Sequence, residues 1–278
     1  MDITDVAAAL LSALLHAGWN AAVKANRNPA QAMTAQMLLG AVLVVPALLW
    51  SGLPAPAAWL WIVGSTLMNV LTIAALLRAY ELGGFGLVYP VVRAVAVLLV
   101  VPMAAAFTGE KFGPAALAGI VVIALSLAVL ALDALRDRAV TPKALAWTLA
   151  AGLGTAAYIM CDAQGVRASG NPWAYGFVVS ITNAAAMCWR QRSQGPPWRQ
   201  LDGQWLATLP IAMASMASYL LILWVWSHAP IAPAAALRDT SSLFAILIAV
   251  AWLKEPFTRT RIVAVLMAAA AVPLLRLG

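Results

Sequence analysis

The 278-residue chain has few charged side chains and an excess of apolar ones. Only 10% of its residues are Asp, Glu, Lys or Arg, while 64% are hydrophobic. A soluble domain is nearer a quarter charged and half apolar, because it needs polar residues to coat its surface. The composition therefore excludes a soluble fold and indicates an integral membrane protein whose surface faces lipid.

Histidine and cysteine are scarce as well. The chain has only His16, His228, Cys161 and Cys188, without a C-x-x-C pair or a histidine cluster. The nucleotide-binding loop and the G-x-S-x-G and H-E-x-x-H motifs are also missing. We therefore predict no catalytic residue, no metal site, no disulfide and no cofactor. A membrane-embedded enzyme acting on lipid remains an alternative, but it would need a nucleophile or metal cluster that is not visible.

What the chain does contain is ten apolar runs that meet or approach the length of a transmembrane helix. Such a helix needs about 20 residues at 1.5 Å each. Pro, Gly and Asn lie in the short gaps between the runs, as helix-to-helix turns require. No basic residue precedes the first run, so we expect a permanent span there instead of a cleaved signal peptide. The predicted spans are 6–23, 30–50, 57–77, 86–107, 114–132, 144–160, 173–188, 205–226, 231–253 and 262–275.

The chain divides into two related halves. Three residues in and after the fourth run recur 145 positions later, in and after the ninth. Because each half has an odd number of spans, the second half enters the membrane from the opposite side, and the repeats are inverted. We predict an all-α integral membrane protein of ten transmembrane helices, with inverted five-helix repeats at residues 1–135 and 140–278. The matched pairs are Arg93 with Arg238, Glu110 with Glu255, and Phe112 with Phe257.

Basic residues concentrate in the odd-numbered gaps between the spans. Lys and Arg mark cytoplasmic loops, so this distribution predicts that both termini lie outside the cytoplasm. It also accounts for the net charge of +7 without nucleic-acid binding. The odd-numbered gaps hold Lys24, Arg27, Arg78, Arg136, Arg138, Lys143, Arg190, Arg192, Arg199, Lys254, Arg259 and Arg261, and the even-numbered gaps and the tail hold Lys111, Arg167 and Arg276.

Arg93 and Arg238 are the clearest candidates for solute binding. An ionisable side chain inside a span costs about 2.5–3.5 kcal/mol on insertion scales, which makes it a functional candidate by default. Each arginine lies about 11 Å from one membrane face at 1.5 Å per residue, so the two guanidinium groups should bracket the midplane. Their forked donors would bind an anionic group such as a carboxylate or a phosphonate. The alternative is that Asp239 or Glu81 neutralises them and the pairs only fasten helices.

Two carboxylates are candidates for coupling. Asp239 directly follows Arg238, so on a helix the two side chains point about 100° apart and need not pair. It would take up a proton, bind an ammonium group or act as a structural counter-ion, and the sequence leaves these alternatives open. Asp162 is the second coupling candidate. For Asp162, which ends the sixth run, a hydrated helix end is the favoured interpretation.

Four further residues complete the predicted binding set. His16, Trp19 and Asn20 share one face of the first predicted helix, at spacing i, i+3 and i+4. Tyr89 lies four residues before Arg93, on the same face of the fourth. An aromatic ring beside an amide and an imidazole would line a solute pathway. The alternative makes Trp19 an interfacial anchor and His16 a satisfied interior histidine.

Five short strings stand out in the first helix, at the turn before the fourth, and at the ends of the fourth and ninth. They are Leu15-His16-Ala17-Gly18-Trp19-Asn20, Arg78-Ala79-Tyr80-Glu81-Leu82-Gly83, Tyr89-Pro90 with Arg93, Gly109-Glu110 and Lys254-Glu255-Pro256. Over nearly the whole chain the sequence resembles the drug/metabolite transporter superfamily, in its ten-helix EamA-type branch. The resemblance implies a five-plus-five inverted bundle in a bacterial inner membrane, whose cavity is lined mainly by helices one, three, four, six, eight and nine. It also implies export of amino acids or other metabolites, and the chain has a looser likeness to a subgroup associated with phosphonate use. The resemblance further implies that both termini lie in the cytoplasm, which conflicts with the orientation predicted from the Lys and Arg distribution.

The sequence thus predicts a secondary active transporter of a small polar or anionic metabolite, namely an amino-acid-like compound, an organic acid or a phosphonate. The two halves would rock around a midplane site and so give alternating access across the cytoplasmic membrane. A channel is a further alternative, because an inverted repeat also permits one. The expected partners are the solute, the lipid bilayer and a coupling proton, with no nucleic acid. Monomer and homodimer both stay open.

Overall fold

The structure, a computed structural model, describes residues 1–26, 28–83, 85–136, 141–201, 203–253 and 258–277. Within these ranges every regular element is a helix, which confirms the predicted all-α class. The first half contains α1 (Ile3–Lys24), α2 (Pro29–Ser51), α3 (Trp59–Gly83), α4 (Phe85–Thr108) and α5 (Pro114–Arg136). The second contains α6 (Pro142–Ala168), α7 (Pro172–Arg190), α8 (Trp205–Trp226), α9 (Ile231–Asp239), α10 (Ser241–Leu253) and α11 (Arg259–Leu277). Short 3₁₀ helices η1 (Pro56–Ala58), η2 (Arg192–Gln194) and η3 (Pro197–Leu201) lie between them.

The second helix of each half starts in the same way. The side chain of Asn28 accepts a hydrogen bond from the backbone N–H of Gln31, and Pro29 follows as the first helical residue of α2. Asn171 caps α7 in the same manner, with Pro172 next. An asparagine cap satisfies a free N–H of the first turn, and proline fits there because it has no N–H to satisfy. The Asn-Pro dipeptide therefore sets both helix starts locally.

The predicted ninth span is not one helix. It divides into α9 and α10 at Thr240, whose backbone N–H and hydroxyl donate to the Leu237 carbonyl at 3.2 Å and 2.6 Å. A bond to the third residue back tightens the turn and competes with the regular helix pattern. As a result α9 ends directly after Arg238 and Asp239. Broken helices of this kind carry binding sites near the midplane in many transporters.

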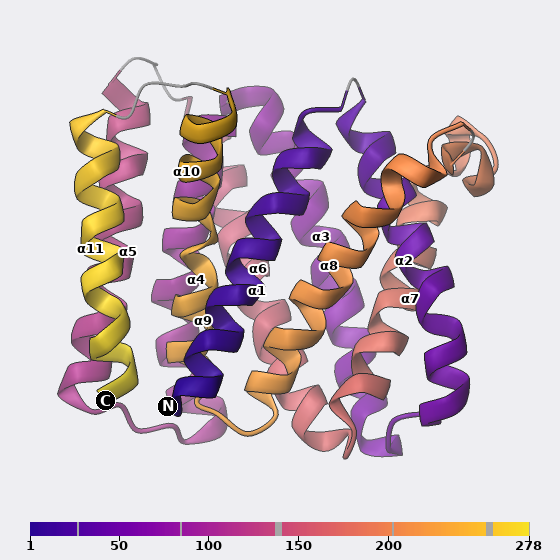
Figure 1. The fold of residues 1–278 in the computed structure, drawn as a ribbon, viewed down its shortest axis with the longest axis horizontal. Helices are drawn as coiled ribbons and strands as arrows, with labels where there is room; N and C mark the ends of the chain where they lie inside the picture. The colour runs from indigo at the N-terminus through magenta and orange to yellow at the C-terminus, as the bar shows by residue number, and fades with distance from the viewer. Residues whose placement is uncertain (27, 84, 137–140, 202, 254–257, 278) are drawn as a thin grey trace.

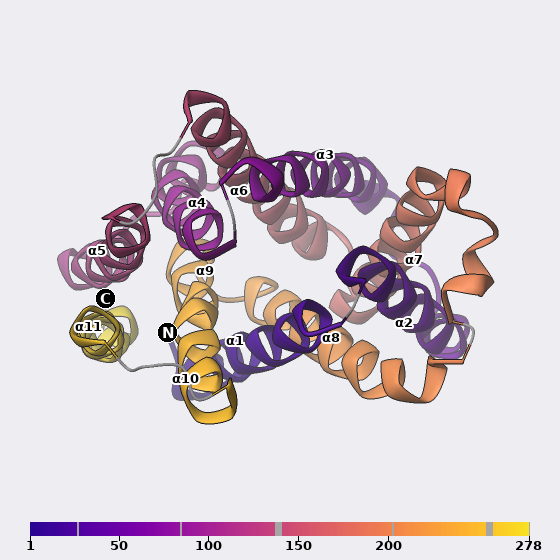
Figure 2. The same cartoon turned by 90° about the horizontal axis from the view of Figure 1, so that it is seen from above.

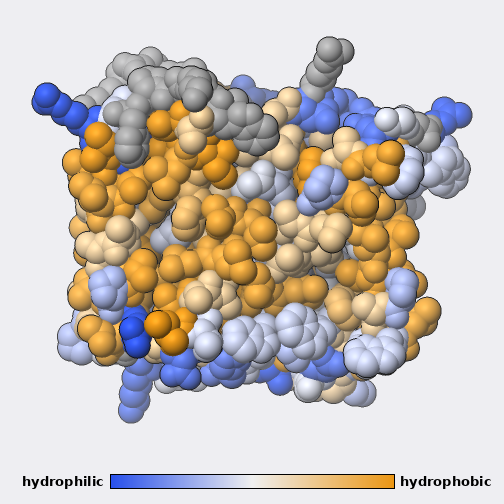
Figure 3. Space-filling model, viewed as in Figure 1, coloured by the Kyte–Doolittle hydropathy of each residue, from blue (hydrophilic) through white to orange (hydrophobic). Residues whose placement is uncertain are grey.

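The surface of the bundle is suited to lipid. Figure 3 shows a broad apolar band, with hydrophilic side chains gathered along its two edges. Among the described residues, nine helical stretches are long and apolar enough to cross a membrane, with α9 and α10 contributing one stretch together. The predicted seventh span, α7, is outside this set because it carries polar residues such as Ser180, Thr182 and Asn183. It nevertheless packs lengthwise against α2 within the bundle.

Helix packing follows the inverted repeat. If the halves are exchanged, α1 corresponds to α6, α2 to α7, α3 to α8, α4 to the α9–α10 pair and α5 to α11. Under this exchange the α1–α8 packing becomes the α6–α3 packing, and the α4–α6 packing becomes that of α9 and α10 on α1. The α2–α7 and α5–α11 pairs map onto themselves. Figure 1 shows both termini at one end of the bundle, so the second half starts from the other end.

The ten-helix, two-repeat architecture is thus confirmed, while the repeat boundaries at 1–135 and 140–278 stay a prediction. Residue 140 lies outside the described residues. So do Glu255 and Phe257, the second-half members of two of the three matched pairs.

Orientation in the membrane is a testable consequence of the charge distribution. Exposed Arg78, Arg190 and Arg259 lie at helix ends on the side of the bundle opposite to the termini. We therefore expect a reporter that is active only in the cytoplasm to be silent when fused after Gly278. The same reporter inserted after Asn26, in the α1–α2 turn, should be active. A bright signal from the C-terminal fusion would overturn this orientation and favour the cytoplasmic termini that the family resemblance implies.

Candidate functional site

A cavity of about 550 Å³ lies between the two halves. This volume is within the usual range for a small-molecule site. Its lining extends to Val23 near the end of α1, Pro29 at the start of α2 and Gln191 just after α7, all at the end of the bundle opposite to the termini. The helices that the resemblance implies all contribute, and α2 and α7 do so as well. The predicted residues in the wall are His16, Trp19, Asn20, Tyr89, Arg93, Asp162 and Arg238.

Arg93 joins α4 to α9 and to α1. One of its terminal nitrogens donates to Oδ1 of Asp239 at 2.9 Å, and the other lies 2.7 Å from Nε2 of His16. Arg93 and Asp239 are buried, at 7% and 1% exposure. A guanidinium can only donate, so Nε2 of His16 accepts, and the imidazole is neutral with its proton on Nδ1. Arg93 therefore has Asp239 as its charged partner, one of the two counter-ions expected, while its role in solute binding stays a prediction.

For Glu81, the other proposed counter-ion, the structure gives a partner other than Arg93. It pairs with Arg78 at 2.6 Å on the surface, where both side chains are more than half exposed. The expectation for Glu81 was thus wrong in its partner. Glu81 pairs with Arg78 because Arg78 lies only three residues before it, on the same face of α3.

Arg238 is in a different situation from Arg93, although the repeat pairs them. It is 6% exposed, and its Nε has no hydrogen-bond partner among the described residues. Its guanidinium lies 5.9 Å from the ring centroid of Trp226, and it lines the cavity. The repeat offset that matches Arg93 with Arg238 also matches Ala94 with Asp239. The first half therefore has no carboxylate at the position that corresponds to Asp239. The second arginine of the pair is a buried cation that faces the cavity and interacts electrostatically, without a described hydrogen bond, with the carboxylates of Asp162 and Asp239.

Asp162 lies in the interior of α6 and not at a hydrated helix end, so the favoured interpretation of this residue was wrong. Its carboxylate is 1% exposed and accepts hydrogen bonds from three hydroxyl groups. Ser65 donates at 2.5 Å, Tyr175 at 3.1 Å and Tyr219 at 2.9 Å. The error follows from helix length, because α6 extends to Ala168 whereas the apolar run stops at 160. The three hydroxyls come from α3, α7 and α8, so they tie both halves to one carboxylate.

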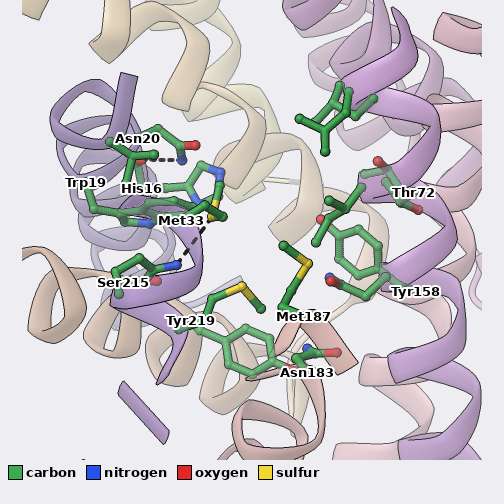
Figure 4. Close-up of a pocket in the computed structure, with 18 of the residues that line it drawn as sticks. His16, Trp19, Asn20, Met33, Thr72, Tyr158, Asn183, Met187, Ser215 and Tyr219 are labelled. Carbon is green, nitrogen blue, oxygen red and sulfur yellow. Dashed lines mark hydrogen bonds between the residues drawn. The ribbon is translucent and has the colours of Figure 1, made fainter. Parts of the chain in front are cut away.

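The first-helix residues also face the cavity. Trp19 packs edge-on against His16, with ring centroids 5.0 Å apart, and its Nε1 has no hydrogen-bond partner among the described residues. Asn20 donates from its amide to the His16 carbonyl at 2.7 Å, a bond within its own helix. Tyr89 lies against Arg93, with 5.3 Å from the guanidinium carbon to the ring centroid. Trp19 thus faces the cavity and not the lipid interface, and it offers a free N–H donor (Figure 4).

Several wall residues were missing from the predicted set. Gln36, Asn69, Thr72 and Asn183 carry polar groups into the cavity, and four methionines form much of its apolar lining. A signal for the amides exists in the sequence, since uncharged polar residues in mid-span are uncommon, but most of these bond between helices. No sequence signal separates cavity methionines from lipid-facing ones. The four are Met33, Met37, Met187 and Met216.

The other end of the bundle, near the termini, is closed by polar contacts between the halves. Glu110, which follows α4, accepts from the backbone N–H groups of Ile231 at 2.8 Å and Ala232 at 3.5 Å. Arg167 of α6 donates to the Trp226 carbonyl at 2.9 Å and approaches Glu110 at 3.5 Å. The carboxylate thus satisfies free N–H groups in the first turn of α9, where negative charge is favourable.

A second contact closes the same end. His228, in the turn before α9, lies 2.8 Å from the carboxylate of Asp5 in α1. Within the described residues no group of three or more His, Cys, Asp or Glu side chains lies close enough together to hold a metal. Among the described residues, the site therefore combines Arg238, whose guanidinium faces the cavity, the Arg93–Asp239 ion pair and the hydroxyl-bound carboxylate of Asp162.

Comparisons with known proteins agree with this architecture. A family model described as the EamA-like transporter family matches the chain twice, over residues 4–132 and 142–277. A solved crystal structure resembles the chain with a TM-score of 0.77 at 15% identity, covering 98% of this chain and 95% of that one, and at this identity the likeness shows the fold alone. No curated protein matches the chain. Because the two family matches span nearly its whole length, the chain belongs to the EamA-like transporter family, whose members are membrane transporters of the drug/metabolite transporter superfamily.

Proposed function

We propose that the protein is a secondary active transporter that carries a small metabolite with an anionic group across a bacterial cytoplasmic membrane. The observation that carries this proposal is Arg238, a buried guanidinium that faces the cavity without a protein partner for its Nε among the described residues. The Asp162 and Asp239 carboxylates act on Arg238 electrostatically, but no described residue forms a hydrogen bond with it, so a solute anion would supply the hydrogen-bonded partner that a buried charge requires. A carboxylate or a phosphonate would accept two parallel hydrogen bonds from the fork.

Alternating access is supported by the asymmetry between the two ends of the bundle. The cavity extends to the end that carries the α1–α2 turn, while Glu110, Arg167, Asp5 and His228 join the halves at the end that carries the termini. In an inverted repeat, each half can adopt the conformation of the other, which would close the first end and open the second. The bridging contacts would then have to break in every transport cycle.

Coupling is the next element of the proposal. Arg93 and Asp239 belong to different halves, so their ion pair joins α4 to α9 across the repeat interface. We propose that Asp239 exchanges this partner for a proton during the cycle. Burial in the span favours the neutral acid whenever the arginine moves away, and the arginine favours the carboxylate whenever it returns. Asp162, whose three hydroxyl partners hold it in place, is the second candidate for this role.

The experiment uses proteoliposomes and a solute identified by a thermal-shift screen of amino acids, organic acids and phosphonates, since ligands of the folded state raise its melting temperature. The wild-type protein should show saturable counter-flow without a gradient, and accumulation when a proton gradient is imposed. The Asp239→Asn variant should keep counter-flow and lose gradient-driven accumulation.

Each outcome of this experiment is informative. If Asp239→Asn still accumulates solute against its concentration gradient, Asp239 is not the coupling site. If it loses both activities, Asp239 is a structural counter-ion. Flux in the wild type that neither saturates nor shows counter-flow would identify a channel, and release of a modified solute would identify an enzyme.

A further inference from the structure

Two of the three described charged residues in the cavity wall, both arginines, come from helices at one end of its long direction, and the third, Asp162, comes from α6. Arg93 and Arg238 come from α4 and α9, while α2 and α7 lie at the far end, with α1, α8, α3 and α6 between them (Figure 2). The described wall residues that α2 and α7 contribute include no charged side chain. A solute whose anionic group reaches Arg238 therefore extends its remaining atoms toward an uncharged end.

Thioethers dominate the apolar chemistry of that far end. Met33 and Met37 come from α2 and Met187 from α7, and Met216 of α8 lies beside them against Gly40 of α2. Methionine side chains are unbranched and polarisable, so they adapt to apolar groups of different shape. The amide of Gln36 is itself directed at a thioether, with Nε2 3.4 Å from Sδ of Met33. The described wall residues of this end thus combine thioethers with uncharged polar groups such as Gln36 and Asn183, so they can pack against an apolar group but offer no charged partner.

We infer that the solute is an amphipathic monoanion, with its anionic group at Arg238 and an apolar body of variable shape against the methionines of α2 and α7. This inference rests on the proposed function, because it takes Arg238 as the anion site. It separates the solute classes that the sequence left open. A compact dicarboxylate or a small hydrophilic phosphonate would place a further charge or polar group where the described wall residues of α2 and α7 offer thioethers and uncharged amides but no cation, so its desolvation would be compensated less well than that of an apolar group.

The test measures binding of straight-chain monocarboxylates from acetate to hexanoate to the purified protein, by calorimetry and by thermal shift. Each added methylene should tighten binding about fourfold in the wild type, as expected for burial of one CH₂ group. Alkylamines of the same lengths, which enter detergent micelles but carry the opposite charge, should not stabilise the protein. A dicarboxylate of matched length should bind more weakly than its monocarboxylate.

Two sets of variants locate the two ends of the solute. Arg238→Gln should weaken every member of the series by a similar factor and leave the dependence on chain length unchanged. Met33→Gln and Met187→Gln, alone and combined, should leave acetate binding unchanged and reduce the gain per methylene. Met213→Ala is the matched control, because Met213 is 58% exposed on the outer surface and should change neither property.

The outcomes separate the inference from the proposed function. A wild type that binds acetate but gains nothing with chain length overturns the apolar end and leaves the anion site intact. An unchanged gain per methylene in the methionine variants also overturns it, because the apolar body would then lie elsewhere. If Arg238→Gln binds the whole series as well as the wild type does, the proposed anion site itself is wrong.

Discussion

Arg93→Gln is expected to lower the free energy of unfolding by about 3–5 kcal/mol, because it leaves the buried Asp239 carboxylate without its charged partner. The same change leaves Nε2 of His16 without the donor it now accepts from. The double variant Arg93→Gln, Asp239→Asn should recover most of this loss, since neither buried charge then remains. Reversible unfolding in mixed micelles measures both effects, and the difference between the single and double variants gives the coupling energy.

The exposed Arg78–Glu81 pair provides the matched control for this prediction. Arg78→Gln removes an arginine from an ion pair whose side chains are 58% and 60% exposed. Such surface pairs contribute only about 0–1 kcal/mol, because water screens them. An Arg93→Gln protein that is no less stable than Arg78→Gln would show that the Arg93–Asp239 bond is not formed in the membrane protein.

Arg238→Gln should have the opposite profile, with a severe loss of function and little loss of stability. Charged hydrogen bonds contribute about 1.5–3 kcal/mol each, so the loss of a two-bonded fork should weaken binding of the anionic solute at least about 100-fold. The empty protein should lose much less stability than Arg93→Gln does, because no described side chain loses a hydrogen bond and the removed charge acts on the Asp162 and Asp239 carboxylates only at longer range. Arg238→Lys keeps the charge but not the fork, and should restore binding only in part.

Transport in proteoliposomes measures the expected loss of function, and the melting temperature of the empty protein measures the expected stability. The comparison with Arg93→Gln is the control, since the two arginines are equivalent by sequence. If Arg238→Gln unfolds as easily as Arg93→Gln, then Arg238 is also a structural counter-ion, and the anion site lies elsewhere. If it transports normally at wild-type stability, neither role is correct.

Taken together, the two arginines show how an inverted repeat can produce unlike sites from like residues. Arg93 pairs with Asp239 of α9 in the other half. In the exchanged arrangement, the residue of α4 that corresponds to Asp239 is Ala94, which cannot pair with Arg238. We therefore propose that Arg93 holds the halves together and that Arg238 is available to a solute. A prediction that treats the pair as equivalent misses this difference, because it depends on the identity of a single residue on the partner helix.

The sequence by itself determined the features that depend on local composition. Long apolar runs and sparse charge predict membrane spans because lipid tolerates few polar groups, and five spans in each half require inverted repeats. The same reasoning singled out Arg93, Arg238 and Asp239, since an ionisable residue inside a span is costly and is therefore a functional candidate. The predicted residues of the first helix also reached the cavity, because a spacing of three and four places them on one helix face.

Only the tertiary structure decided how these groups pair. Arg93 and Asp239 are 146 positions apart, and Ser65 and Asp162 are 97 apart, so no local pattern connects them. The break at Thr240 and the burial of Asp162 likewise depend on neighbouring helices, which local propensity does not describe. The energy of a buried charge is set by what surrounds it, and in a helical bundle those surroundings come from distant segments of the chain.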